Sequence, residues 1–332
     1  MLRLVSILIL ALLASACGSG TSPPPAPTPT LVKPANLLTP RPTVPPATPT
    51  PRVVTAPRTA LPSLIPTPAP SVRGTPVAAS EPLQGLLLDD LLTSPIIGES
   101  FPYRIYLPPD YQRSPQKRFP VLYMLHGAGG NYTEWADSFL PEQADRLIVA
   151  RVIPPIIVVM PDDGGQTYWA NWSDDGPRWG DYLTEDIVST IDQRYHTLAN
   201  PQSRAIGGLS MGGLGAPNLA FQHPDVFGVV GAHSPSVRLE PDPALPFLQG
   251  QTFWENDPVW LAQNRSGLDS LTIWLDAGDE DMWLPNIEAV HAALVDEGLH
   301  PAWHIFPGPH EAGYWIEHVP DYLRFYGGAL KT

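Results

Sequence analysis

Ser210 stands in the segment "GLSMG", with Gly208 two residues before it and Gly212 two residues after it. A serine hydroxyl is a weak nucleophile at neutral pH, so chemistry here needs a general base and an acid that orients the base. Glycines at these two positions let a strand turn sharply into a helix without collisions between side chains. The spacing predicts a nucleophilic serine on such a turn, with the Met211 amide aimed at an oxyanion. A glycine-rich turn whose serine only caps a helix is the alternative.

Acidic residues and histidines follow Ser210 in the order that such a catalytic set requires. The segment "LDAGDEDMW" offers four carboxylates, those of Asp276, Asp279, Glu280 and Asp281. Five histidines come after them, and His310 alone is expected in a loop that follows a strand. The other four are expected in helices, within a strand or before one, and these are His291, His300, His304 and His318.

The elements that must position these residues are short apolar runs separated by longer amphipathic segments. The runs are "VLYMLHG", "PPIIVVMPDD", "RAIGGLS", "FGVVGAHS", "LTIWLDAGDED" and "PAWHIFPGPH". Their apolar continuity predicts strands buried on both faces, and the helical periodicity of residues 180–195 and 285–298 predicts helices between strands. We therefore expect an α/β doubly wound fold with a mostly parallel central sheet, helices on both faces and an antiparallel strand pair at its start. In such sheets reactive groups gather beyond the carboxyl ends of the strands.

Three separated segments then carry a resemblance to a known family. They are "YLPPDYQRSPQKRFPVLYMLHGAGGNYTEW", "RAIGGLSMGGLGA" and "GPHEAGYW". Together they resemble the esterase D type "putative esterase" family of α/β-hydrolases over nearly all of residues 84–328. That family includes feruloyl and acetyl-xylan esterases, enterochelin esterases, formylglutathione hydrolases and mycobacterial mycolyltransferases. The resemblance implies an α/β-hydrolase fold and a serine esterase that works through an acyl-enzyme intermediate.

The resemblance also implies roles for particular residues. It places the catalytic base at His310, and its pattern of a glycine followed three residues later by an aspartate maps Gly278 to Asp281. The expected triad is therefore Ser210, His310 and Asp281, with Asp279 and Glu280 as alternatives for the acid. The implied chemistry uses protein groups only, so we expect no cofactor and no metal.

Further residues are expected to bind the substrate or stabilise its charge. In the loop "HGAGG" the resemblance suggests the Ala128 amide as the second oxyanion donor beside Met211. We also expect the substrate site to include His126, Gly127, Trp169, Trp172 and Trp283, because aromatic side chains could line a cleft for an acyl chain or stack on a sugar or phenolic ring.

Two other functions are compatible with these motifs. An acyl-enzyme does not specify its acceptor, so an acyltransferase of the mycolyltransferase type is one alternative. A non-catalytic surface protein that binds a carbohydrate or a siderophore on the same fold is the other. The intact set of serine, acid and histidine favours catalysis over binding alone.

The N-terminus "MLRLVSILILALLASAC" predicts an export signal over residues 1–17. Cys17 is the only cysteine, and its position after the apolar run resembles the lipid-attachment site of bacterial lipoproteins. That family usually has leucine three residues before the cysteine, whereas Ala14-Ser15-Ala16 also fits ordinary cleavage. We expect a lipoprotein anchored outside the cytoplasm, or a secreted protein if Cys17 carries no lipid.

Composition separates a linker from the catalytic domain. Residues 21–80 hold 18 of the 43 prolines, so residues 18–80 are expected to form a disordered linker before an esterase domain at 81–332. All 33 acidic residues and 13 of the 19 lysines and arginines lie in 81–332, which gives that region a net charge of 13 − 33 = −20. Such a surface repels polyanions and excludes nucleic acid as a partner. The expected partners are an ester substrate and, through the lipid, a membrane.

Overall fold

A computed structural model of the chain describes residues 75–76, 82–172 and 175–332. The predicted signal peptide, Cys17 and nearly all of the predicted linker lie outside the described residues. Within the described part of the chain, no helix has the length and apolar character needed to cross a membrane.

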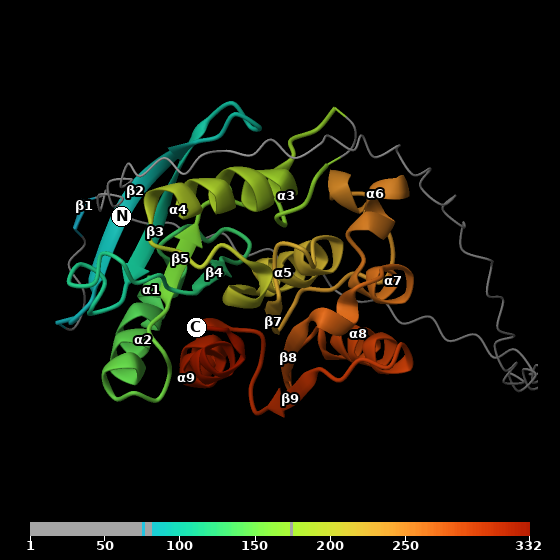
Figure 1. The fold of residues 1–332 in the computed structure, drawn as a ribbon. Helices are drawn as coiled ribbons and strands as arrows, with labels where there is room; N and C mark the ends of the chain where they lie inside the picture. Colours follow the sequence, from blue (N-terminus) through green and yellow to red (C-terminus); the bar gives the residue numbers. More distant parts are fainter. Residues whose placement is uncertain (1–74, 77–81, 173–174) are drawn as a thin grey trace, which may run out of the picture. The chain divides into compact units, whose positions relative to one another are not determined.

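Nine strands of the described residues form one sheet in the order β1-β2-β3-β5-β4-β6-β7-β8-β9 (Figure 1). The strands β1 to β3 and the β3–β5 pair are antiparallel, and every pair from β5 to β9 is parallel. The bounds are β1 (Thr75–Pro76), β2 (Leu86–Thr93), β3 (Ser100–Leu107), β4 (Val121–Leu125), β5 (Ile157–Pro161), β6 (Arg204–Leu209), β7 (Val229–His233), β8 (Thr272–Gly278) and β9 (Ala302–Phe306). The six predicted parallel strands and the antiparallel opening pair are confirmed.

Helices cover both faces of the sheet, as Figure 1 shows. One face carries α3 (Trp179–Asp181), a π-helical turn (Tyr182–Ile187), α4 (Val188–Arg194), α5 (Ser210–Gln222), α7 (Pro258–Asn264) and α8 (Leu284–Asp296). The other carries α1 (Glu134–Asp137), α2 (Leu140–Val149) and α9 (Ala312–Ala329). The short α6 (Gly250–Glu255) lies between β7 and α7 in the chain.

The two-sided cover explains why the strands are continuously apolar. In β4, Val121, Tyr123 and Leu125 pack into the core on the α5 side. The alternating residues Leu122 and Met124 pack into the core on the α2 and α9 side. Since successive side chains point to opposite faces, both sets must be apolar.

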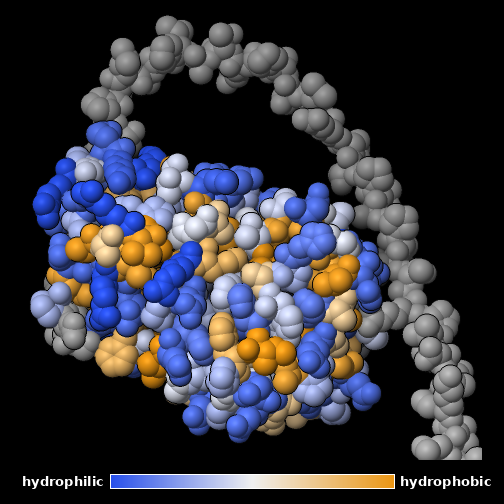
Figure 2. Space-filling view, turned by 90° about the horizontal axis from the view of Figure 1, so that it is seen from below, coloured by the Kyte–Doolittle hydropathy of each residue, from blue (hydrophilic) through white to orange (hydrophobic). Residues whose placement is uncertain are grey.

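The structure differs from the sequence-based expectation at the start of the domain. Thr75 and Pro76, which fall in the predicted linker, form β1 and pair with Asp89 and Leu88 of β2. A proline can occupy this position because an edge strand does not need every amide for the ladder. The sheet thus begins before residue 81. On the face shown in Figure 2, hydrophilic side chains surround several separate groups of apolar ones.

Candidate active site

Ser210 occupies the turn between β6 and α5, with a φ of 51° in the left-handed region. The two flanking glycines make this turn possible. A Cβ on Gly208 would lie 2.4 Å from the carbonyl carbon of Gly212, and a Cβ on Gly212 would lie 2.4 Å from the carbonyl oxygen of Leu125. Ser210 remains partly exposed to solvent.

His310 and Asp281 extend from Ser210 in one line of contacts. The Nε2 atom of His310 lies 2.8 Å from the Ser210 hydroxyl oxygen. Its Nδ1 atom lies 3.1 Å from Oδ2 of Asp281. Residues 210, 281 and 310 are far apart in the sequence, and they meet because β6, β8 and β9 are parallel and end at the same edge of the sheet. This geometry allows a proton to pass from the hydroxyl to the imidazole while the carboxylate holds the ring.

The Asp281 carboxylate is buried and accepts several hydrogen bonds. Its Oδ1 atom accepts from the Trp283 amide at 2.7 Å, and its Oδ2 atom accepts from the Ser234 hydroxyl. Burial by itself raises the pKa of Asp281, but the bonds from His310, Ser234 and the Trp283 amide outweigh burial and hold this pKa below its usual value. The group is therefore a carboxylate at neutral pH.

The alternative acids and bases lie elsewhere. Asp279 and Glu280 are exposed, and Oδ1 of Asp279 accepts from the Gly308 amide at 2.8 Å. Asp276 is fully buried in a separate network. The remaining candidate histidines lie in α8, before β9, in β9 and in α9, namely His291, His300, His304 and His318.

The expected oxyanion donors are Met211, which follows Ser210, and Ala128, which follows Gly127; a Cβ on Gly127 would lie 3.6 Å from the Ser210 Cβ. Met211 is the second residue of α5, and the first four amides of a helix have no acceptor within it. Ala128 is exposed in the loop after β4, and its amide has no acceptor among the described residues. The Gly127 amide is already engaged, because it donates to Oε2 of Glu134 at 2.6 Å. Both expected donors thus keep a free N–H, whereas Gly127 does not.

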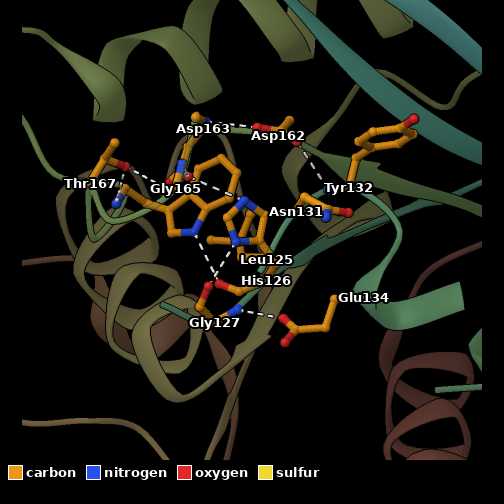
Figure 3. A network of polar contacts seen from close by, with 12 residues as sticks. Leu125, His126, Gly127, Asn131, Tyr132, Glu134, Asp162, Asp163, Gly165 and Thr167 are labelled. Carbon is orange, nitrogen blue, oxygen red and sulfur yellow. Dashed lines mark hydrogen bonds and ion pairs between the residues drawn. The ribbon is translucent and has the colours of Figure 1, made fainter. Parts of the chain in front are cut away.

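His126 is the first residue of this loop after β4, and Figure 3 shows its ring facing Asp163. Its ring is buried, with Nε2 at 3.2 Å from Oδ1 of Asp163. Burial lowers the pKa of His126, but the hydrogen bonding and charge of Asp163 outweigh it, so this pKa lies above its ordinary value. Glu134, which sequence reasoning did not single out, holds the same loop through Gly127.

His126, Asp162 and Asp163 also place possible metal-ligand atoms within 4.8 Å of one another, the sole such group in the described part of the chain. The carboxylate oxygens of Asp162 and Asp163, however, accept hydrogen bonds from the amides of Tyr132 and Gly165 and from the hydroxyl of Thr167 (Figure 3). A further bond comes from the Gly164 amide. The arrangement is that of a hydrogen-bonded loop anchor.

The predicted substrate-binding residues divide into two groups. Trp169 is fully buried and its indole N–H points to the His126 carbonyl at 3.4 Å. Trp169, His126 and Gly127 are all buried in this structure, and their contact with substrate stays a prediction. Trp172 and Trp283 are half-buried and keep part of their surface in solvent.

Comparison with known proteins agrees with this arrangement. The sequence pattern of the family described as "Putative esterase" matches residues 94–326. An endo-1,4-beta-xylanase/feruloyl esterase of Xylanibacter ruminicola is 34% identical over 140 residues, which cover 38% of this chain and 18% of that protein. An esterase of Mycobacterium tuberculosis is 34% identical over 141 residues, which cover 42% of this chain and 30% of that one. The chain thus spans less than a third of these relatives.

Solved structures show the same architecture. A ferulic acid esterase superposes with a TM-score of 0.68 and 26% identity, over 75% of this chain and 99% of that one. An S-formylglutathione hydrolase of Agrobacterium tumefaciens superposes with a TM-score of 0.66 and 18% identity, over 77% and 99%. The predicted α/β-hydrolase fold is confirmed.

Proposed function

The chain belongs to the family described as "Putative esterase", and on that premise we propose that it is an extracytoplasmic serine esterase. The observation that carries the proposal is the continuous contact from the Ser210 hydroxyl through the His310 ring to the Asp281 carboxylate, at 2.8 and 3.1 Å. Ser210 is partly exposed, as a nucleophile must be, and Asp281 is buried, as suits the group that orients the histidine.

The reaction would proceed in two halves. Ser210 Oγ attacks the ester carbonyl carbon while His310 Nε2 takes the hydroxyl proton, and the Met211 and Ala128 amides stabilise the oxyanion. His310 then gives that proton to the leaving alcohol, which leaves an acyl group on Ser210. A water molecule, deprotonated by His310, attacks the acyl carbon, and the carboxylic acid leaves as the proton returns to Ser210.

Esters of hydroxycinnamic acids are the substrate class that we propose to test first. The names of two relatives, one 34% and one 26% identical, refer to feruloyl or ferulic acid esterases. Aromatic surface is present near the triad, because Trp283 binds Asp281 through its amide and its ring packs under the Arg238 guanidinium at 3.9 Å. Such a ring can stack on a phenolic acyl group.

A fluorophosphonate probe tests the catalytic assignment directly. We expect labelling at Ser210, and Ser210→Ala should abolish labelling and lower the turnover of methyl ferulate or nitrophenyl esters by about three orders of magnitude or more without unfolding the domain. An intact protein that neither labels nor hydrolyses any of these esters would refute the proposal and favour a non-catalytic binding protein. Product ratios with and without an added alcohol or sugar separate hydrolysis from acyl transfer.

The location outside the cytoplasm is a further part of the proposal, and it rests on the N-terminal sequence up to Cys17. A lipid on Cys17 would anchor the enzyme to a membrane. Cells fed radiolabelled palmitate should incorporate label into the wild-type protein and not into Cys17→Ala, which should appear in the soluble exported fraction. If the wild-type protein and Cys17→Ala both appear in the soluble exported fraction, Cys17 carries no lipid and the protein is secreted.

A further inference from the structure

Ser234, which directly follows β7, touches both ends of the acid–base pair. It is fully buried, and its hydroxyl donates to Oδ2 of Asp281, the same oxygen that faces His310 Nδ1. The Ser234 Oγ atom also lies 3.0 Å from that Nδ1. We propose, on the basis of the esterase function above, that Ser234 is a positioning residue that fixes the Asp281 carboxylate and the proton-bearing edge of His310.

The placement of hydrogens gives this contact a consequence for the imidazole. A serine hydroxyl has one hydrogen, and here it points to Asp281, so only lone pairs of Oγ face His310. Nδ1 of His310 therefore faces two acceptors, Oδ2 of Asp281 and Oγ of Ser234, and both require a hydrogen on Nδ1. In the neutral ring Nε2 is then free of hydrogen and can accept the proton of Ser210. Ser234 thus enforces the tautomer that the reaction needs.

The backbone of Ser234 is held for this task. Its φ of 50° lies in the left-handed region, which costs free energy in a residue with a side chain. Its amide donates to the Asp276 carbonyl at 3.0 Å, and the Asp276 carboxylate lies 2.8 Å from Nδ1 of His233. That carboxylate accepts further bonds from three buried side chains, those of Trp274, Tyr314 and Tyr322. The buried network around Asp276 therefore holds the backbone of Ser234 in place.

Asp281 is the main charged partner of the His310 ring. Asp281 is the sole acidic residue within ion-pair distance of His310 in the described part of the chain. The ring also packs edge-on against Trp315, with centroids 5.0 Å apart, which is an apolar contact. A change at Ser234 therefore acts on the triad through Asp281 and His310.

The chain offers a matched control two residues away. Ser236 is also buried, but its hydroxyl has no hydrogen-bond partner among the described residues. Ser236→Ala therefore removes a buried hydroxyl from the same loop, while the Ser236 amide, which donates to the Ser210 carbonyl at 3.0 Å, stays in place. Ser234→Ala removes the hydroxyl and keeps Cβ, whereas Ser234→Gly removes it and also suits the left-handed backbone, so a loss of activity in both variants cannot come from strain.

Kinetics provide the first readout. Both Ser234 variants should lower kcat and the rate of fluorophosphonate labelling by about tenfold or more, because a hydrogen bond to a charged group is lost, while KM stays within about twofold. Ser236→Ala should remain within about twofold of wild type. Wild-type rates in Ser234→Ala and Ser234→Gly, or an equal loss in Ser236→Ala, would overturn the proposal.

A spectroscopic readout needs no substrate. The His310 ring proton on Nδ1 should give a low-field proton resonance, assigned by its absence in His310→Gln. We expect this resonance in wild type and Ser236→Ala, and its loss or broadening by solvent exchange in Ser234→Ala. An unchanged resonance in Ser234→Ala would refute the positioning role even in an active esterase. If the wild type fails to label at Ser210, the esterase proposal falls while this comparison still decides the role of Ser234.

Discussion

Asparagine at position 281 would keep the size of the side chain and replace one acceptor oxygen with an NH2 donor. In the wild type, Oδ1 accepts from the Trp283 amide and Oδ2 faces both Ser234 and His310. An amide oxygen that stays with Trp283 would leave NH2 against Nδ1 of His310. The ring would then carry its hydrogen on Nε2, where it cannot accept the proton of Ser210.

The distance sets the size of the effect. An imidazolium on His310 and a carboxylate on Asp281 at 3.1 Å attract each other by about 5 kcal/mol at an effective dielectric constant of about 20. The neutral asparagine loses this attraction, which arises only as the proton moves to the ring. We expect kcat of Asp281→Asn to fall by about 10³- to 10⁴-fold, which corresponds to about 4 to 5.5 kcal/mol.

The assay compares three variants on one nitrophenyl ester, with protein concentration corrected by the folded fraction. Asp279→Asn and Glu280→Gln are the controls, since both side chains are exposed and the Asp279 side chain accepts its hydrogen bond from the Gly308 amide. Each control should stay within about threefold of wild type. If Asp281→Asn remains within about tenfold of wild type, the assignment of the acid is wrong, and a large loss in one control would identify the true acid.

Three further predictions concern stability, each measured by urea denaturation. Gly212→Ala should cost about 3 kcal/mol or more, because its Cβ would meet carbonyl oxygens at the end of β4, whereas Gly328→Ala in open space on α9 should cost nothing. Asp276→Asn should cost about 3 to 5 kcal/mol, since it breaks a buried charge network; a loss under 1 kcal/mol would contradict that account. Asp163 raises the pKa of His126, so the pair stabilises the folded protein most when His126 is protonated. This contribution is complete below the pKa of His126 in the unfolded chain, about 6.5, and is lost as pH rises through its pKa in the folded protein. Asp163→Asn should therefore lose more stability at about pH 5.5 than at about pH 9, and a pH-independent loss would exclude the ion pair.

The sequence predicted the strands and the nucleophile because both have local causes. Continuous apolar runs identify strands covered on two faces. The glycines at 208 and 212 identify the turn at Ser210, because a side chain at either position would collide with the backbone. His310 could be chosen because parallel strands end at one edge, so a histidine in a loop after a strand is near that edge.

Other features depend on contacts between distant segments and left little local signal. The choice of Asp281 over Asp279 and Glu280 follows from the path of one loop, which buries one carboxylate and exposes two. Trp169 was expected to line the substrate site as an aromatic side chain, and the sequence did not indicate that α5 packs against it: a Cβ on Gly215 would lie 2.8 Å from the Trp169 side chain. The place of Ser234 after β7 was visible in the sequence, yet its contacts require the loops after β8 and β9.

The ends of β7 and β8 supply two layers of polar contacts. His233 and Asp276 are direct partners in the parallel ladder, and their side chains bind each other beneath the surface. The chain then continues by one residue to Ser234 and by five to Asp281, which meet in the layer above. The lower layer is closed by buried tyrosines and cannot reach solvent, whereas the upper layer reaches the partly exposed Ser210 through His310. Because the ladder fixes the register of both layers at once, a loss of the lower pair should displace the catalytic groups as well as destabilise the fold.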